Sequence, residues 1–432
     1  MEKVHFIGIK GAGMSALAQV LHDTGYPVQG SDVDTELFTQ KPLETRGIPM
    51  YRFGESEFGQ GQIRVIASNA FKDDHPEIAK CGEAGIPVER YHHFLGGWIR
   101  QFTSVAVTGA HGKTTTTGML AHTFEGLQPT SYLIGDGTGA GVADSTYFVF
   151  ESCEYRRHFL AYEPDYAIIT NIDFDHPDYF SGMDDVISAF QEMADRVKKH
   201  LVACGDDPQV RRMAKPKVPV LYYGFGEHNE LRAEQVRAGA DGMTFEVFMH
   251  NNPLGTFTVS AYGRHSVLNA LAVIGVALLE DLNIDQVKSR LATFGGVKRR
   301  FTEKQVRGNV VIDDYAHHPT EITATLDAVR AKYPGKKVVS VFQPHTYSRL
   351  ETFIDDFANS LSGSDEVYLC NIFGSAREND GGVSIESLME KIPTSRHITE
   401  SNIGQLDGYS DCVLLFMGAG DIQKYQSWYE AR

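Results

Sequence analysis

Short apolar runs alternate with helix-like stretches along most of the chain. The apolar runs are rich in β-branched residues and end at glycine or polar residues, which is typical of buried strands. In the stretches between them, apolar residues recur every three or four positions, as on a helix with one buried face. We expect strands at 63–67, 104–107, 147–151, 166–170, 310–312, 337–342 and 412–416, and helices at 15–24, 115–123, 269–279 and 320–333. This alternation predicts an α/β protein in which helices cover parallel sheets more than once along the chain.

Two glycine-containing segments interrupt the pattern. Residues 94–97 precede the strand at 104, and Gly295 and Gly296 follow the helix at 269–279. A chain of 432 residues is also too long for one ordinary core. We therefore expect three α/β domains, at residues 1–97, 98–297 and 298–432.

The composition is that of a globular protein, with 42% hydrophobic and 22% charged residues. It contains neither an apolar run of ~18 residues nor a signal-peptide pattern, so we expect a cytoplasmic protein without membrane insertion. The five cysteines are scattered and none forms a CxxC pair, which disfavours a zinc ribbon or a disulfide framework. A net charge of -16 disfavours binding to nucleic acid, and a phosphorylated small ligand would need basic residues close by.

The first glycine-rich turn is His5-Phe-Ile-Gly-Ile-Lys-Gly-Ala-Gly-Met-Ser15, which follows a short apolar run. Gly11 and Gly13 allow close approach of an anion to the backbone, and a helix beginning there offers free N–H groups. The spacing is G-x-x-G-x-G rather than the dinucleotide fingerprint G-x-G-x-x-G, and Asp32 ends the next strand, where Rossmann folds place a ribose-binding acid. The turn predicts a bound nucleotide, either NAD or a nucleotide sugar, with a tight connection that binds nothing as the structural alternative.

The second glycine-rich turn is Val105-Ala-Val-Thr-Gly-Ala-His-Gly-Lys-Thr-Thr-Thr-Thr117. A strand runs into it and a helix follows, which is the setting of a phosphate-binding loop. Backbone amides around Gly109 and Gly112 would wrap the phosphates, Lys113 would neutralise them, and the Thr114 hydroxyl suits Mg²⁺. We therefore predict an ATP or GTP site, although the loop is two residues shorter than the usual G-x-x-x-x-G-K-[ST].

Carboxylates and a histidine end two later strands. Glu151 closes the run at 147–151, Glu154 lies three residues on, and Thr170-Asn-Ile-Asp-Phe-Asp-His176 follows the strand at 166–170. Hard cations prefer oxygen ligands, and phosphoryl transfer needs Mg²⁺ to absorb charge. These residues predict a metal and γ-phosphate site, against the plainer interpretation of a solvated acid and a packed histidine.

Several segments together resemble the Mur ligase family, and the resemblance spans nearly the whole chain. They are the opening H-F-I-G-I-K-G-A-G-M-S, T-G-x-H-G-K-T-T-T at the phosphate loop, T-N-x-x-x-D-H at 170–176, H-x-x-x-N at 265–269, D-D-Y-A-H-x-P at 313–319 and F-Q-P-H-x-x-[ST]-R at 342–349. The resemblance implies an N-terminal Rossmann-like UDP-binding domain, a central P-loop ATPase-type domain with a parallel sheet, and a C-terminal Rossmann-like α/β domain.

The resemblance also implies ligands for particular residues. The UDP-sugar would be bound by Gly11, Ala12, Gly13, Met14, Ser15, Asp32 and Ser68. ATP would be bound by Gly109, Ala110, His111, Gly112, Lys113, Thr114, Thr115, His265, Asn269, Arg300 and Asp314. The amino acid would be bound by Tyr315, His317, His345 and Arg349, and the metal by Thr114, Glu151 and His176. Lys113, His176, His345 and Arg349 would be the catalytic residues. Asn269 also suits a plain role at a helix start.

The implied reaction joins L-alanine to the lactyl carboxylate of UDP-N-acetylmuramate through an acyl phosphate, using ATP and Mg²⁺, in peptidoglycan precursor synthesis. A ligase that reattaches a recycled peptide to the same UDP-sugar is the nearest alternative. A nicotinamide-dependent dehydrogenase would leave the second turn unused, and a non-ligase P-loop protein would consume no amino acid. Selectivity for alanine over serine or glycine, and the choice between monomer and homodimer, stay open.

Two departures from the family pattern affect the expected metal site. The segment Glu151-Ser-Cys-Glu-Tyr-Arg-Arg-His-Phe159 differs from the E-x-D-E-S-D form of many members, and we interpret Cys153 as a bystander. Some members carry a carbamoylated lysine after the D-H pair, but no lysine lies between His176 and Lys198. The amine's base is not indicated by any motif.

Overall fold

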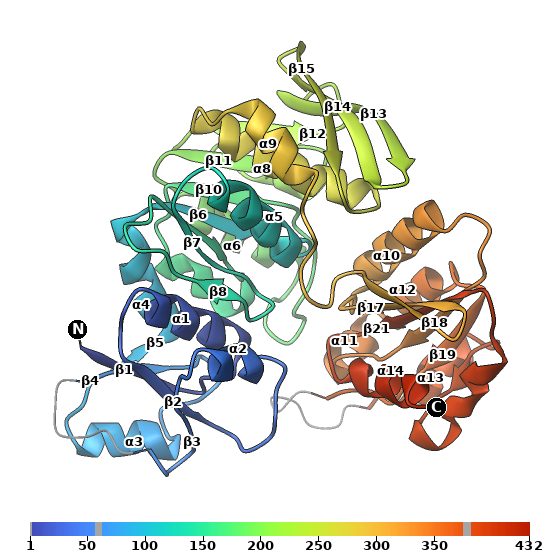
Figure 1. The fold of residues 1–432 in the computed structure, drawn as a ribbon, viewed down its shortest axis with the longest axis horizontal. Helices are drawn as coiled ribbons and strands as arrows, with labels where there is room; N and C mark the ends of the chain where they lie inside the picture. Colours follow the sequence, from blue (N-terminus) through green and yellow to red (C-terminus); the bar gives the residue numbers. More distant parts are fainter. Residues whose placement is uncertain (1, 57–62, 375–381) are drawn as a thin grey trace.

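The computed structural model describes residues 2–56, 63–374 and 382–432. Its strands form three sheets that follow one another along the chain (Figure 1). The first is parallel throughout, with the order β3-β2-β1-β4-β5. Its strands are β1 (Lys3–Ile7), β2 (Val28–Asp32), β3 (Met50–Arg52), β4 (Ile63–Ala67) and β5 (Val88–Arg90), and its helices are α1 (Ala12–Asp23), α2 (Gln40–Thr45), α3 (Pro76–Glu83) and α4 (Tyr91–Trp98).

The second sheet has ten strands in the order β15-β14-β13-β12-β11-β10-β6-β9-β7-β8. Its strands are β6 (Thr103–Thr108), β7 (Thr130–Leu133), β8 (Gly139–Ala140), β9 (Tyr147–Glu151), β10 (Tyr166–Ile169), β11 (His200–Cys204), β12 (Val220–Gly224), β13 (Leu231–Gly239), β14 (Gly242–Met249) and β15 (Asn252–Val259). Its helices are α5 (Lys113–Glu125), α6 (Met183–Ala194), α7 (Pro208–Arg212), α8 (Arg264–Leu279) and α9 (Ile284–Leu291). The strands from β7 to β13, in sheet order, run parallel.

The third sheet has the order β16-β17-β21-β18-β19-β20 and is parallel except at β16. Its strands are β16 (Thr302–Val306), β17 (Asn309–Asp314), β18 (Val338–Phe342), β19 (Glu366–Leu369), β20 (Arg396–His397) and β21 (Val413–Met417). Its helices are α10 (Pro319–Lys332), α11 (Tyr347–Thr352), α12 (Ile354–Leu361), α13 (Ile385–Lys391) and α14 (Ile422–Glu430). The protein is therefore a three-domain α/β protein with mostly parallel sheets.

The expected strands and helices are confirmed to within a few residues, but one expectation was wrong. The helix expected to begin at Asn269 begins at Arg264, directly after Gly263 at φ 88°, so Asn269 lies inside α8. The central sheet is mostly parallel, as expected, and its antiparallel pairs lie at the two edges, in β13–β14–β15 and in β7–β8. A tight turn with His250 and Asn251 at positive φ joins β14 to β15, which is the geometry of a hairpin connection.

The buried apolar residues show how the domains are joined. One apolar cluster contains residues of the first sheet's domain, such as Leu17 and Phe94, together with Phe148 of β9. The two clusters on either side of the third sheet contain only residues of the C-terminal domain. Polar contacts therefore contribute much of the attachment of that domain. No helix in the described part of the chain is long and apolar enough to cross a membrane.

Candidate active site

The phosphate-binding loop connects β6 to α5 and is held by the end of β10. Gly109 has φ 137°, and a Cβ there would lie 2.0 Å from the Thr170 hydroxyl, so only glycine fits. Ala110 and His111 donate their N–H groups to the carbonyl and side-chain oxygens of Asn171 at 3.2 and 2.8 Å. Because α5 begins directly after the loop, its first turn has free N–H groups of the kind that bind an anion.

Lys113 is the first residue of α5, and its ammonium group points back over the loop. Nζ donates to the Ala110 carbonyl at 3.0 Å and to Glu154 Oε2 at 3.0 Å. Burial alone would disfavour the charged form, but Glu154 and the other acidic groups nearby raise the pKa of Lys113 above its ordinary value. The ammonium group is therefore charged and held beside a buried carboxylate.

The three residues expected to bind the metal lie around this ammonium group. Glu151 ends β9, accepts the Gly135 N–H at 3.1 Å and is hydrogen-bonded by Thr114, and burial raises its pKa. His176 Nε2 lies 3.7 Å from Glu154 Oε1, and burial lowers the pKa of His176, which favours a neutral imidazole. Thr114 and Glu151 thus lie together and His176 lies beside Glu154, and carboxylate, hydroxyl and imidazole groups of this kind suit a divalent cation of the Mg²⁺ type.

Cys153 and Glu154 extend this group beyond the expected ligands. Ligand atoms of Cys153, Glu154 and His176 lie within 4.8 Å of one another. Cys153 is exposed, whereas Glu154 is buried. Glu154 is a site residue for which the sequence offered a signal, since it lies three residues after Glu151.

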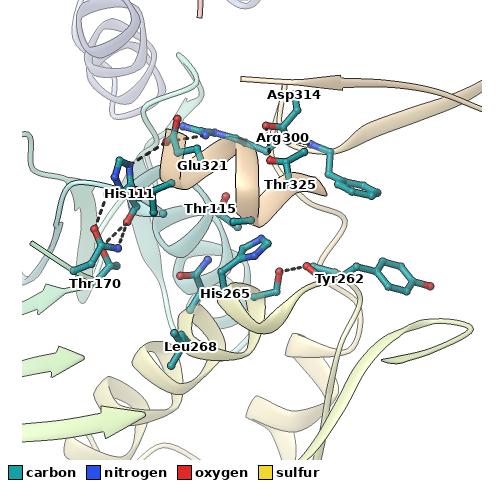
Figure 2. A pocket seen from close by; sticks show the side chains of 18 of the residues that line it. His111, Thr115, Thr170, Tyr262, His265, Leu268, Arg300, Asp314, Glu321 and Thr325 are labelled. Atoms are coloured by element: carbon teal, nitrogen blue, oxygen red, sulfur yellow. Dashed lines mark hydrogen bonds and ion pairs between the residues drawn. The ribbon is translucent and has the colours of Figure 1, made fainter. Parts of the chain in front are cut away.

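A cavity of about 740 Å³ opens between the central and C-terminal domains. Seven of the residues expected to bind ATP line it, namely His111, Gly112, Thr115, His265, Asn269, Arg300 and Asp314. Figure 2 shows Arg300, Asp314, Glu321 and Thr325 on one side of it, and His111, Thr170 and His265 on the other. Gly109, Ala110, Lys113 and Thr114 belong to the loop beside it rather than to its lining.

Several lining residues were not expected from the sequence. Tyr262 lies just before α8, and Thr325 and Lys332 lie on α10. Asp314 accepts the Phe301 N–H at 2.8 Å and the Thr325 hydroxyl at 3.2 Å, so its carboxylate also fixes the wall of the cavity. His265, in the first turn of α8, also lines the cavity.

A network of ionic and hydrogen bonds connects the central domain to the C-terminal domain beside the loop. His111 contacts Asp173 at 2.9 Å and Glu321 of α10 at 3.5 Å, and the Thr320 hydroxyl donates to Asp173 at 2.9 Å. Against the effect of burial, Asp173 and Glu321 raise the pKa of His111 to about 9. The loop histidine therefore bridges two acids from different domains.

The residues expected to bind the amino acid lie on the same side of the C-terminal domain. The rings of His317 and His345 are 6.2 Å apart, and Tyr315 lies 4.9 Å from the guanidinium of Arg300. Burial lowers the pKa of His345 to about 3. Arg349 donates from Nη2 and Nε to Asp175 Oδ1 at 2.7 and 3.0 Å. Through this ion pair, the C-terminal residues expected to bind the amino acid are attached to Asp175, which directly precedes His176 in the sequence.

The residues expected to bind the UDP-sugar gather at the carboxyl ends of β1, β2 and β4. Gly11, Ala12, Gly13, Met14 and Ser15 begin α1, Asp32 ends β2, and Ser68 follows β4. Asp32 Oδ2 accepts the Lys10 N–H at 2.6 Å, and the Ser15 hydroxyl donates to the Thr39 carbonyl at 3.1 Å. Strand ends of an open parallel sheet are the usual place for a ligand.

Comparison with known proteins agrees with the three-domain arrangement of the chain. Three family models match successive parts of the chain: the Mur ligase family catalytic domain at 3–103, the Mur ligase middle domain at 107–277 and the Mur ligase glutamate ligase domain at 299–419. The chain is similar to UDP-N-acetylmuramate-alanine ligase MurC from Thermotoga maritima, with a TM-score of 0.84, 27% identity and coverage of 99% of this chain and 98% of that one.

Two further solved structures share the fold at lower identity. A murein peptide ligase from Psychrobacter arcticus has a TM-score of 0.72 and 22% identity, covering 99% of this chain and 98% of that one. MurF ligase from Thermotoga maritima, solved in complex with ADP, has a TM-score of 0.65 and 18% identity, covering 94% of each chain. A dehydrogenase does not fit these matches. The chain belongs to the Mur ligase family, and it is an ATP-dependent ligase of peptidoglycan precursors.

Proposed function

We propose that the protein joins L-alanine to the lactyl carboxylate of UDP-N-acetylmuramate, with ADP and phosphate as the other products. The observation that carries this proposal is the similarity to the alanine ligase of Thermotoga maritima over nearly the full length of both chains. The chain's own residues support it, because the phosphate loop, the acidic cluster and the cavity lie at one junction between two domains.

In this proposal each domain brings one substrate. Residues 1–97 bind the UDP-sugar at Gly11–Ser15, and residues 98–297 bind ATP at the loop and in the cavity. Residues 298–432 bind the amino acid near Tyr315, His317 and His345. The base of the nucleotide would lie toward His265 and Asn269, and its phosphates toward Lys113.

The first chemical step activates the carboxylate. A carboxylate oxygen attacks the γ-phosphorus of ATP, the bond to the bridging oxygen breaks, and ADP leaves. Lys113 neutralises charge on the transferred phosphoryl group, and Arg300 lies across the cavity for the same purpose. Mg²⁺ bound by Thr114, Glu151 and His176 would supply further charge neutralisation at the phosphate oxygens.

The second step forms the amide. The neutral amine of alanine attacks the acyl carbon, the tetrahedral intermediate collapses, and phosphate leaves with the oxygen it received. The amine must lose a proton to become nucleophilic, and the proton leaves before or during the attack. Closure of the C-terminal domain over the junction would keep water from the acyl phosphate.

Phosphate release with ATP, Mg²⁺ and UDP-N-acetylmuramate, with and without L-alanine, tests the proposal. We expect release that depends on both substrates, and a mass spectrum showing the UDP-sugar extended by one alanine. Lys113→Ala should abolish turnover while UDP-sugar binding persists, because Lys113 lies in the central domain. Release that ignores both substrates would contradict the proposal. Faster turnover with a recycled tripeptide than with alanine would favour the recycling ligase, whose fold this chain shares.

A further inference from the structure

Residues 134–141, which we call the glycine hairpin, contact all three domains. They follow β7, include β8 and contain the run Gly135-Asp-Gly-Thr-Gly-Ala-Gly141, with glycine at every second position. Residues 135–137 form the turn, whereas Gly139 and Gly141 lie two positions apart in and just after the extended β8, so they share one face, which has no side chain at either position. Figure 1 shows β8 beside α1, on the side of the central domain that faces the N-terminal domain.

The bare face of the glycine hairpin packs directly on the backbone of α1. A Cβ at Gly139 would lie 2.1 Å from the carbonyl oxygen of Ala16, and one at Gly141 would lie 2.4 Å from that of Val20. Gln19 of α1 donates to the Gly137 carbonyl at 2.7 Å and accepts the Gly139 N–H at 3.4 Å. The glycine hairpin and α1 are therefore joined backbone to backbone. The same helix begins at the glycine turn proposed to bind the UDP-sugar.

The first glycine of the hairpin packs against a proposed metal ligand. The Gly135 N–H donates to Glu151 Oε2 at 3.1 Å. A Cβ at Gly135 would lie 2.1 Å from the same oxygen, so the carboxylate rests on the bare backbone. The position of this peptide unit therefore limits where the Glu151 carboxylate can lie.

The next residue, Asp136, ties the hairpin to the linker into the C-terminal domain. Its Oδ1 accepts the Thr138 N–H at 2.9 Å, and its Oδ2 accepts the Lys298 N–H at 3.1 Å. The Asp136 side chain is buried, with 9% of the residue exposed. A buried carboxylate that accepts two backbone N–H groups is a firm anchor on both sides.

Lys298 lies where the linker leaves the central domain. Gly295 and Gly296 precede it, and a Cβ at either would meet open space, which leaves this part of the linker free to turn. Arg299 follows it and already belongs to the C-terminal side, since its Nη2 donates to the Gly418 carbonyl at 2.9 Å. Any rotation of the C-terminal domain about the two glycines therefore acts first on the bond between Lys298 and Asp136.

We propose that Asp136 is a positioning residue, which transmits the placement of the C-terminal domain through Gly135 to the Glu151 carboxylate. The inference rests on the proposed function, in which Glu151 is a metal ligand. When the linker is docked, Asp136 holds the hairpin so that the Gly135 N–H meets Glu151. When the linker leaves, the hairpin stays on α1 but its tip loses one anchor, and the metal site loses its aligned carboxylate.

Mn²⁺ binding to the full-length enzyme with a non-hydrolysable ATP analogue, followed by electron paramagnetic resonance, tests this proposal without turnover. In Asp136→Asn one oxygen can still accept the Thr138 N–H, but an amide NH₂ then faces the Lys298 N–H. We expect Mn²⁺ affinity to fall by roughly tenfold, as for loss of one charge-assisted hydrogen bond. UDP-sugar affinity, measured by calorimetry, should stay within about twofold, because α1 and its glycine turn are untouched. Asp144→Asn, which changes an exposed acid three residues after the glycine hairpin, is the matched control and should change neither value.

Two more variants separate the linker from the hairpin. Lys298→Pro removes the N–H itself and should weaken Mn²⁺ binding as Asp136→Asn does, with the double variant no weaker than either single one. Gly135→Ala should weaken it through Glu151 directly, and it keeps the test available if Asp136→Asn does not fold. Unchanged Mn²⁺ affinity in Asp136→Asn would overturn the proposal. Additive effects of Asp136→Asn and Lys298→Pro in the double variant would also overturn it. A wild-type protein that binds Mn²⁺ in this way but joins no amino acid would instead refute the proposed function.

Discussion

The buried ion pair between Asp175 and Arg349 offers a direct test of how the C-terminal domain is held. Asp175 follows β10 in the central domain and Arg349 lies in α11, and their side chains are only 7% and 6% exposed. Asp175→Asn removes the negative charge but keeps the size of the side chain. The guanidinium of Arg349 would then stay buried without an anion, although it still donates to the His345 carbonyl.

The expected cost follows from burial. Removing one partner of a buried pair costs about 3–5 kcal/mol, and the remaining amide oxygen places this variant near the lower end. A loss of about 3 kcal/mol changes the ratio of docked to undocked domain by roughly 150-fold. The pair between Lys391 and Asp355 is 48% and 72% exposed, so Asp355→Asn should cost less than about 1 kcal/mol and serves as the control.

Hydrogen exchange measures this difference segment by segment. We expect amides of α11 and of residues 170–176 to exchange up to about 100-fold faster in Asp175→Asn, while those of β18 keep their protection. Arg349 outweighs burial and holds the pKa of Asp175 well below its usual range, so the pair contributes above the ordinary aspartate pKa and is lost only as the pH falls through the lower value. The difference in exchange rate between the wild-type protein and Asp175→Asn should therefore be the same at pH 6 and at pH 8. A variant that exchanges less than about threefold faster would refute the reasoning.

Three further predictions concern the phosphate loop. Gly109→Ala should abolish nucleotide binding measured by calorimetry and leave UDP-sugar binding intact, because its Cβ would strike the Thr170 hydroxyl. The pKa of His111 in the folded protein is about 9, above its ordinary value of 6.5. Its contribution to docking of the C-terminal domain is therefore complete below pH 6.5 and is lost as the pH rises through 9. The radius of gyration from X-ray scattering should grow over that pH range in the wild-type protein, but not in His111→Asn. A non-hydrolysable ATP analogue should bind at least about 100-fold more weakly in EDTA than with Mg²⁺, because its phosphates would meet the carboxylates of Glu151 and Glu154.

The elements that the sequence predicted well are those fixed by local rules. The apolar run before Gly109, the two glycines and the helix after Lys113 each follow from backbone geometry within a few residues, and the structure has all of them. The antiparallel strands β13, β14 and β15 were not predicted, because half of their residues are polar and they contain no glycine motif of known chemistry. The start of α8 was predicted too late in the chain, because the first turn of the helix is polar and the apolar run begins only after it.

Contacts between domains could not be predicted, because they join residues more than a hundred positions apart. Thr320 and Asp173 are 147 positions apart, and Arg349 and Asp175 are 174 apart. The family motif led us to place Arg349 near the amino acid, but no local pattern names the acid that holds it. The glycine hairpin was missed for a similar reason, since alternating glycines show their purpose only when α1 and Glu151 are beside them.

The electrostatic arrangement of the junction explains how an acidic protein can bind a polyphosphate. The net charge of -16 repels phosphate at long range, and the acids Glu151, Glu154, Asp173 and Asp175 add to that repulsion near the loop. Each of these acids except Glu151 lies within 4 Å of a basic side chain from another segment of the chain, including Lys113, His111 and Arg349. The carboxylate of Glu151 instead accepts hydrogen bonds from Gly135 and Thr114, and burial opposes its ionisation. A bound cation would favour its charged form, so nucleotide, metal and the geometry around Gly135 act on the same side chain.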